Sequence, residues 1–281
     1  MRFIVGGAMD KSTFFSTLWA SYAAITPQAE RIQHLLMPSQ TVPVVHDHVA
    51  LRTFDIEPLN IATLEPLMLS LGYVCLEHYV FPEKHLQARA YLGVGVDDPK
   101  IFLSELETQS LTFENQHIVR HFCAQIVPEE VATVALFTRG RVWQMPTWAQ
   151  YQSLRAESEY AAWLSVMGLC ANHFALSVDR LSPPRSLEQV NAKVKSAGFV
   201  LNTQGGEIKG RPADLLEQSS TLADQTSVTF ADGDAHAIAT CYYEFARRYE
   251  DVNGQVFHGF LAANANTIFE STEQTQEALH A

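Results

Sequence analysis

The sequence predicts an α+β protein in which a βαβββ unit occurs twice and the two copies form a half-open β-barrel around a shared cleft. Two observations lead to this prediction. The segment NHFALSV (172–178) repeats the His, Ala and Leu of DHVALRT (47–53), at an offset of 125 residues from His48 to His173. In both copies a helix and then further strands follow in the same order, which favours a duplication over a chance match.

The first copy is preceded by two helices and followed by a helical connection. Residues 12–25 begin at Ser/Thr caps and form the first helix, and a second helix reaches about residue 37. A helix near residues 58–72 follows the first strand, with Pro58 close to its start and Gly72 just past its end. Residues 114–165 are largely helical, apart from the Gly/Pro-containing TRGRVWQMPTW. The strands of the first copy are expected at about 44–54, 73–80, 86–94 and 100–107.

The second copy begins with a strand at 172–178 and a helix at about 186–198. Its remaining strands are expected at about 199–202, 206–210, 226–230 and 237–249. This order divides the chain into N-terminal helices (1–40) and one barrel domain (41–281). Within that domain we expect repeat one at 41–110, a helical insertion at 111–168 and repeat two at 169–281.

Composition and charge limit the possible partners. The 281 residues carry 31 acidic and 19 basic side chains, a formal net charge of -12, which disfavours nucleic acid because phosphate binding needs a basic surface. No apolar run approaches the roughly 18 residues of a membrane-spanning helix, and the N-terminal segment lacks the pattern of a secretory signal. We expect a soluble, cytoplasmic protein with no membrane partner. The sequence leaves its oligomeric state open.

The four cysteines are scattered along the chain without a CxxC pair. This spacing argues against a structural zinc site and against a disulfide framework. We expect all four to be reduced and buried as small apolar side chains. A catalytic thiol is disfavoured, because no histidine is linked to any of them by a sequence pattern. The cysteines are Cys75, Cys123, Cys170 and Cys241.

The first strand carries polar residues on what should be its inward face. Strand side chains alternate, so His48, Ala50 and Arg52 point one way, and Asp47 points the other. A packed core would place a large apolar side chain where Ala50 stands, so this row is a candidate site. Asp47 is then either solvated or a partner of a site residue, and His46 is expected at the strand entry.

Two histidines at equivalent positions of paired repeats would face each other across the cleft. His48 and His173 are therefore candidate metal ligands, although a strand histidine can also be an ordinary core residue. Glu244, within the aromatic stretch CYYEFARRYE, is the candidate third ligand, since a carboxylate there is costly unless it is paired or metal-bound. The alternative for Glu244 is an ion pair with Arg247 or Arg248. Two histidines and one carboxylate form the ligand set of non-haem Fe(II) oxygenases.

Four segments together resemble the 2-oxoadipate dioxygenase/decarboxylase family of the vicinal oxygen chelate superfamily: DHVALRTF, NHFALSV, YYEFARR and GFLAANANTIFESTE. The resemblance implies that His48, His173 and Glu244 hold Fe(II). It also implies that Arg52 binds the substrate carboxylate as a catalytic-site residue. Asn264, in an expected C-terminal strand, falls near a substrate-contacting position at which the family has serine.

The resemblance implies a reaction as well. Fe(II) would bind the 1-carboxylate and 2-keto oxygen of a 2-oxo acid together with O2, and the substrate would lose CO2 and be hydroxylated. For 2-oxoadipate the product would be 2-hydroxyglutarate. The partners are accordingly a small-molecule 2-oxo acid and O2.

Other interpretations stay open. The same fold supports glyoxalase-like lyases, isomerases or hydrolases with Zn²⁺ or Ni²⁺, and non-enzymatic proteins that bind a small ligand. Arg52 could instead form a structural ion pair with Glu77 or Asp97. The segment GGEIKGRP (205–212), with Lys209 and Arg211, is typical of a hairpin and lacks the spacing of a phosphate loop.

Overall fold

The computed structural model describes residues 9–38, 43–127, 129–183, 185–264 and 271–272. The helices are α1 (Lys11–Ile25), α2 (Pro27–Leu36), α3 (Ile61–Ser70), α4 (Phe113–Cys123), α5 (Trp148–Glu157), α6 (Glu159–Met167) and α7 (Leu187–Ser196). The strands are β1 (His46–Phe54), β2 (Val74–Phe81), β3 (Leu86–Leu92), β4 (Lys100–Leu106), β5 (Ala171–Ser177), β6 (Lys209–Arg211), β7 (Leu216–Ser220), β8 (Gln225–Thr229), β9 (Ala235–Ala239) and β10 (Tyr242–Arg248).

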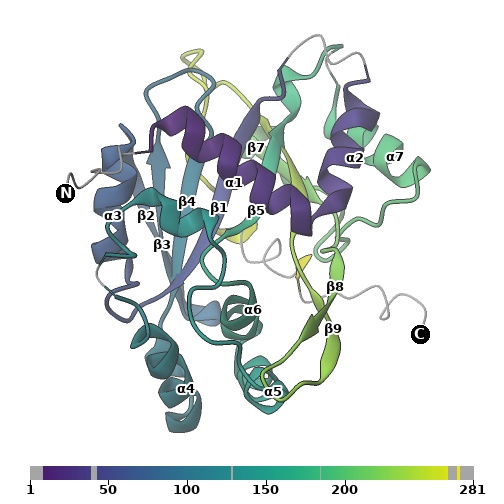
Figure 1. Cartoon of the computed structure of the whole chain (residues 1–281). Coiled ribbons are helices and arrows are strands. Elements are labelled where there is room, and N and C mark those ends of the chain that lie inside the picture. The colour runs from purple at the N-terminus through teal and green to yellow at the C-terminus, as the bar shows by residue number, and fades with distance from the viewer. Residues whose placement is uncertain (1–8, 39–42, 128, 184, 265–270, 273–281) are drawn as a thin grey trace, which may run out of the picture.

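Eight strands form one strongly curved sheet in the order β2-β3-β4-β1-β5-β10-β7-β6 (Figure 1). The order is symmetric about its centre. β1 pairs in parallel with β4, β5 pairs in parallel with β10, and the two halves meet along the antiparallel pair β1 and β5. The predicted α+β fold, with two βαβββ units forming a half-barrel, is confirmed.

The turns between corresponding strands repeat as well. A single 3-10 turn joins β2 to β3 at Pro82–Lys84, and another joins β6 to β7 at Pro212–Asp214. Each turn ends at a residue in the left-handed region, His85 with φ 52° and Leu215 with φ 64°. Neither residue is glycine, so both turns share a backbone conformation that L side chains adopt rarely. The two copies therefore match in local geometry where their side chains differ.

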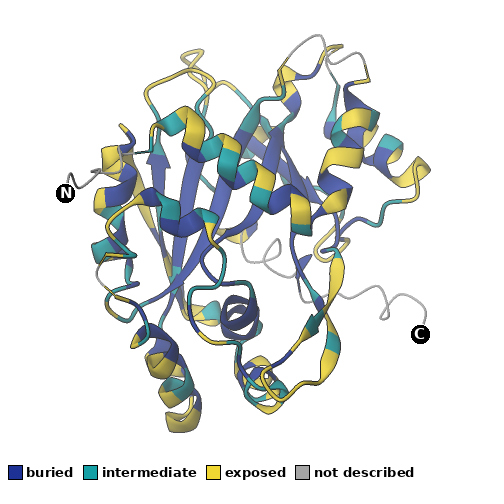
Figure 2. Ribbon diagram, in the orientation of Figure 1, coloured by how far each residue is buried: buried dark blue, intermediate teal, exposed yellow. Residues whose placement is uncertain are grey.

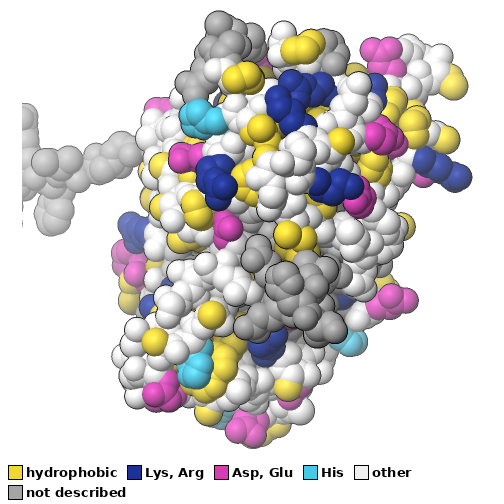
Figure 3. All heavy atoms as spheres, turned by 90° about the vertical axis from the view of Figure 1, so that its right-hand side faces the viewer, with side chains coloured by type: hydrophobic (Ala, Val, Ile, Leu, Met, Phe, Trp, Pro, Cys, Tyr) yellow, Lys and Arg dark blue, Asp and Glu magenta, His cyan; other side chains and the backbone are white. Residues whose placement is uncertain are grey.

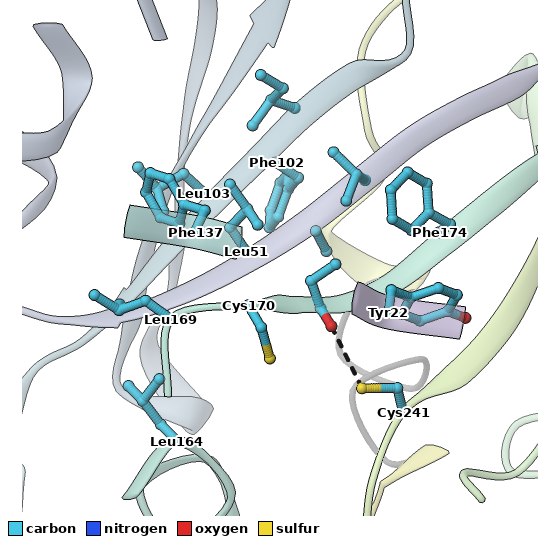
Figure 4. Packing of buried hydrophobic residues seen from close by; sticks show 14 of the residues in the cluster. Tyr22, Leu51, Phe102, Leu103, Phe137, Leu164, Leu169, Cys170, Phe174 and Cys241 are labelled. Carbon is cyan, nitrogen blue, oxygen red and sulfur yellow. Dashed lines mark hydrogen bonds between the residues drawn. The ribbon is translucent and has the colours of Figure 1, made fainter. Parts of the chain in front are cut away.

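Helices cover one face of the sheet. Asp10 caps α1 by accepting a hydrogen bond from the Thr13 amide, and the helix then lies across β1 and β5 in Figure 1. Its Trp19 and Tyr22 rings pack against Phe174, with centroids 5.2 and 5.1 Å away. Because Phe174 alternates with His173 along β5, α1 covers the face opposite to His173. The dark blue strands of Figure 2 and the close packing in Figure 4 show this core.

The helical insertion lies against one end of the sheet. In Figure 1, α5 and α6 lie below the large sheet, next to the separate β8–β9 hairpin. The Tyr160 hydroxyl of α6 donates to the Ser104 carbonyl at 2.7 Å, and the Trp163 indole donates to the Thr240 carbonyl. Trp148 of α5 stacks on His236 of the hairpin, with ring centroids 3.8 Å apart. These contacts place α6 beside the interior of the half-barrel.

Three strand predictions in the second copy were wrong. The expected strand 237–249 is two strands, because β9 pairs with β8 in its own hairpin and β10 joins the large sheet between β5 and β7. In 199–202 the structure has only a bridge at Leu201, and in 206–210 the strand is β6, which begins at residue 209. Strand β7 was missed, because its sequence LEQSS is polar although every residue of it is buried.

All four cysteines are free thiols, but Cys75 is exposed, contrary to the prediction, because β2 is an edge strand. Cys241 donates to the Ala171 carbonyl at 3.3 Å, the dashed line in Figure 4.

On the face shown in Figure 3, basic and acidic side chains are interspersed. None of the helices described has both the length and the apolar character to cross a membrane.

Candidate metal centre

His48, His173 and Glu244 form one buried cluster. The Nε2 atoms of the two histidines are 3.4 Å apart. His48 Nε2 lies 3.4 Å from Glu244 Oε1, and His173 Nε2 lies 3.3 Å from Glu244 Oε2. The exposed fractions of these residues are 2%, 5% and 0%. Three potential ligand atoms thus converge on one point, within 4.8 Å of one another.

Strand register explains this convergence. Ala50 of β1 is opposite His173 of β5, so His48 lies one step along the same face. Ala175, two residues beyond His173, is paired with Glu244 of β10. Small side chains at positions 50 and 175 leave the space between the three polar groups open.

Each imidazole is oriented through its other nitrogen. His48 Nδ1 lies 2.7 Å from Asp47 Oδ1, and His173 Nδ1 lies 3.2 Å from Asn172 Oδ1. These contacts turn both Nε2 atoms toward the cluster, as the outer contacts of metal-binding histidines do. Asp47 is buried rather than solvated. Simple alternation would place it away from the imidazole, but the β1–β5 register shifts between His46 and His48, so Asp47 sits in a β-bulge.

Asp47 belongs to a buried charge network behind His48. Arg248 donates to both its carboxylate oxygens, from Nε at 2.6 Å and from Nη2 at 3.0 Å, and Lys100 Nζ lies 3.6 Å away. Burial, the largest single influence, would raise the pKa of Asp47, but the charge of Arg248, the hydrogen bond to His48 and the charge of Lys100 together hold it well below the usual range. Arg247 pairs with Asp179 at 3.6 Å. The observed partners of both arginines are thus aspartates, and Glu244 is directed to the histidines instead.

Glu244 has the features of an anionic ligand. Gln218 donates to its Oε1 at 2.7 Å, whereas its Oε2 has no hydrogen-bond partner among the described residues. Burial raises the pKa of Glu244 and lowers the pKa of His173, because each charged form loses its hydration. A divalent cation between the three groups would offset these costs. The donor set and the unpartnered buried oxygen therefore fit a metal ion.

Aromatic rings flank the cluster. The ring of Tyr242 stacks on His173 with centroids 4.6 Å apart, and that of Phe260 meets His48 edge-on at 4.9 Å. Phe102 packs against Phe260 at 5.0 Å. These rings were not predicted from the sequence, although Tyr242 lies two residues before Glu244 and so shares its strand face.

Arg52 lies on the same strand face as His48. Its guanidinium carbon is 4.8 Å from the Tyr160 ring centroid and 4.9 Å from that of Trp163. Nη1 lies 3.6 Å from Glu159 Oε2, and Nη2 donates to the Thr272 hydroxyl at 3.5 Å. The side chain is nearly inaccessible yet lines a pocket of about 420 Å³.

The two acids considered as partners of Arg52 are engaged elsewhere. Glu77 accepts a hydrogen bond from the Tyr79 hydroxyl at 2.5 Å, and Asp97 pairs with Arg180. Glu159 was missed because it comes from the helical insertion, far from the repeat that revealed the other residues. No local pattern links it to Arg52.

Asn264 is buried but does not lie in a strand. Residues 262–264 are helical, and the Asn264 amide donates to the Leu261 carbonyl at 3.0 Å. Its side-chain Nδ2 donates to Gln218 Oε1 at 3.0 Å, and Gln218 in turn donates to Glu244. The predicted strand was wrong at this residue, and its later part, 265–270, lies outside the described residues. Asn264 thus reaches the cluster through Gln218.

Comparisons with known proteins agree with this geometry. The family model of 2-oxoadipate dioxygenase/decarboxylase matches residues 23–252. The chloroplastic/amyloplastic 2-oxoadipate dioxygenase/decarboxylase of Oryza sativa subsp. japonica is 36% identical, covering 94% of this chain and 79% of that protein. The chloroplastic protein of the same name from Arabidopsis thaliana is 33% identical, covering 91% and 75%.

Solved structures of three proteins resemble this chain over most of its length. The Oryza sativa hydroxyglutarate synthase in complex with 2-oxoadipate superposes with a TM-score of 0.87 at 33% identity, over 98% of this chain and 96% of that one. A Shewanella frigidimarina protein with a provisional hydrolase name has a TM-score of 0.86 at 41% identity, over 92% and 100%. A glyoxalase superfamily protein of Ralstonia eutropha, at 19% identity and TM-score 0.71 over 88% and 84%, shares the fold. The chain belongs to the 2-oxoadipate dioxygenase/decarboxylase family, whose members are enzymes.

Proposed function

We propose that this enzyme is an Fe(II)-dependent dioxygenase that decarboxylates a 2-oxo dicarboxylic acid such as 2-oxoadipate. One molecule of 2-oxoadipate and one of O2 would give one 2-hydroxyglutarate and one CO2, which balances all atoms. The observation that supports this most strongly is the buried His48, His173 and Glu244 cluster in a chain of this family. Two histidines and a carboxylate on one side of a metal leave positions for substrate and oxygen.

The residues around the metal would fix its ligands and exclude water. When bound, Fe(II) supplies chelation of the 2-oxo acid and activation of O2. Asp47 and Asn172 hold the two imidazoles, and Gln218 holds the carboxylate. The rings of Tyr242 and Phe260 shield both histidines from solvent, which strengthens the electrostatic interactions inside.

Arg52 would bind the distal carboxylate. It stands two residues beyond His48 on the same strand face, about 7 Å along the strand, a distance suited to the body of a C6 diacid. Its planar fork suits a bidentate carboxylate contact, and the rings of Tyr160 and Trp163 hold that fork in place. A shortened acid would stay bound there between decarboxylation and hydroxylation, so both steps would act on one oriented molecule.

Anaerobic reconstitution with Fe(II), followed by exposure to O2 and 2-oxoadipate, tests the proposal. We expect O2 consumption and CO2 release in equal amounts, together with 2-hydroxyglutarate, without added 2-oxoglutarate. Substitution of Zn²⁺ or Ni²⁺ for iron should abolish the reaction. Turnover of the oxo acid in the absence of O2 would instead assign the protein to the lyase or isomerase class.

A further inference from the structure

Glu159 interacts with the residue to which we assign substrate recognition. It is the first residue of α6, and its Oε2 lies 3.6 Å from Arg52 Nη1. The Thr272 hydroxyl donates to the same Oε2 at 3.1 Å and accepts from Arg52 Nη2 at 3.5 Å. Glu159, Thr272 and Arg52 thus contact one another, and the Glu159 carboxylate faces the guanidinium.

Glu159 also lines two pockets, one of them next to Arg52. One pocket, of about 420 Å³, is lined by Arg52, Glu159 and Tyr160. A second, of about 340 Å³, is lined by Glu159 and Thr272 together with residues of the β8–β9 hairpin. The Glu159 side chain is 20% exposed, against 2% for Arg52, so the carboxylate is the more accessible partner of the pair.

A second carboxylate approaching Arg52 meets two opposing interactions. The guanidinium attracts it, and the negative charge of Glu159 repels it and competes for the same donors. A ligand whose distal end is uncharged meets neither, so it leaves the Arg52–Glu159 pair intact. The pair therefore acts only on ligands that carry a distal charge.

We propose that Glu159 is a specificity-determining residue that sets the affinity for dicarboxylic 2-oxo acids by occupying Arg52 when no substrate is bound. The proposal rests on the proposed role of Arg52 as the carboxylate clamp. Substrate binding moves the guanidinium from the internal carboxylate to that of the ligand. Removing the charge of Glu159 should therefore tighten diacid binding without changing the binding of a monoacid.

Binding measurements on the Fe(II) protein without O2 test this proposal, because no turnover occurs. The probes are 2-oxoadipate and 2-oxohexanoate, which has a methyl group in place of the distal carboxylate. We expect Glu159→Gln to lower the Kd for 2-oxoadipate about three- to tenfold. The effect is modest because solvent screens an ion pair that is partly exposed. The Kd for 2-oxohexanoate should stay unchanged.

Glu157→Gln is the matched control. Glu157 lines both pockets and lies two residues before Glu159, but it accepts hydrogen bonds from the Thr112 amide and hydroxyl, at 2.8 and 2.6 Å, rather than from Arg52. This variant removes the same charge from the same pockets and should leave both Kd values unchanged. Equal tightening in both variants would mean a general field effect and would overturn the specific role of Glu159.

Two further outcomes decide between the proposals. If Glu159→Gln weakens or does not alter 2-oxoadipate binding while Arg52→Lys weakens it, Arg52 is the clamp and Glu159 only positions it, so this inference is wrong. If Arg52→Lys leaves the preference for the diacid intact, the clamp assignment itself fails and the inference falls with it. Melting temperatures of all variants show whether the fold is retained.

Discussion

The β1–β4 half and the β5–β10 half of the sheet present equivalent backbone positions to the cluster but use them differently. His48 and His173 are equivalent, and each has an alanine two residues further along. The residue paired with that alanine is Phe102 in the first half and Glu244 in the second. The second half thus supplies the third candidate ligand, whereas the first half places an aromatic ring at the matching position.

The next equivalent positions differ as well. Arg52 in the first half corresponds to Ser177 in the second, again by the 125-residue offset. The residues that orient the two imidazoles, Asp47 and Asn172, are also equivalent, yet only Asp47 is charged. In the proposed function, the residues that both halves retain would hold the metal. The residues that differ would leave one side of the metal open and provide a place for a charged substrate.

Removing either symmetric histidine should have the largest effect. His48→Ala and His173→Ala each leave two ligands, which bind a divalent cation much more weakly than three. Both variants should lose stoichiometric metal, measured by elemental analysis after gel filtration, while unfolding cooperatively. His78→Ala, which changes an exposed histidine on β2, is the control. Full metal retention in both cluster variants would place the metal elsewhere.

Making the halves alike at the third ligand position should have the next largest effect. Phe102→Glu would introduce a second carboxylate at the position equivalent to Glu244, and it should fill a position that substrate needs. We expect loss of 2-oxoadipate turnover together with tighter metal binding. Without metal the new buried charge should cost about 3 kcal/mol of unfolding free energy.

Calorimetric unfolding with and without Fe(II) checks the Phe102→Glu prediction. The variant should gain more stability from the metal than the original protein does. Phe102→Leu, which changes the ring without adding a charge, should bind metal normally. If Fe(II) stabilises both variants equally, the side chain at position 102 does not reach the metal. The two halves would then be equivalent in backbone position but not in side-chain reach.

The sequence predicted the parts of the site that follow from the duplication. The repeat of His48 at His173 could be recognised because the same Ala and Leu follow both histidines. Glu244 could be recognised because it is a carboxylate among aromatic residues. Asp47 could not be placed, since the bulge that turns it toward His48 depends on pairing with β5. Strand β7 was missed for a related reason, because its polar side chains are buried by the closing sheet rather than by their own hydrophobicity.

The asymmetric arginine should have a smaller and more selective effect. Arg52→Lys keeps the positive charge but loses the planar fork. The fall in kcat/KM for 2-oxoadipate should correspond to a loss of about 2–4 kcal/mol of transition-state stabilisation, with metal content unchanged. A monocarboxylic 2-oxo acid should lose much less. If the variant instead melts at a lower temperature and both classes of substrate are affected alike, Arg52 is a structural residue paired with Glu159.

The residues that orient the imidazoles should have the smallest effect, and an unequal one. Asp47→Asn should weaken metal binding about ten- to a hundredfold, the usual consequence of losing such an outer contact. Asn172→Ala removes one long neutral contact of 3.2 Å and should cost only a few-fold. The comparison is measured as metal affinity, by competition with a chelator at a temperature well below unfolding.

Asp47→Asn has a second consequence that must be separated from the first. Asp47 is also the carboxylate that holds Arg248, whose Nη1 in turn donates to the Phe257 and Gly259 carbonyls at 2.9 and 2.7 Å, next to the ring of Phe260. Asp179→Asn is the control, because Asp179 accepts from the Arg248 amide at 2.8 Å and has no contact with either imidazole among those described. If Asp179→Asn weakened metal binding as much as Asp47→Asn, the charge network would act through the Arg248 strand and not through the orientation of His48. If Asp47→Asn weakens metal binding more than both Asp179→Asn and Asn172→Ala do, the first half orients its histidine more firmly than the second.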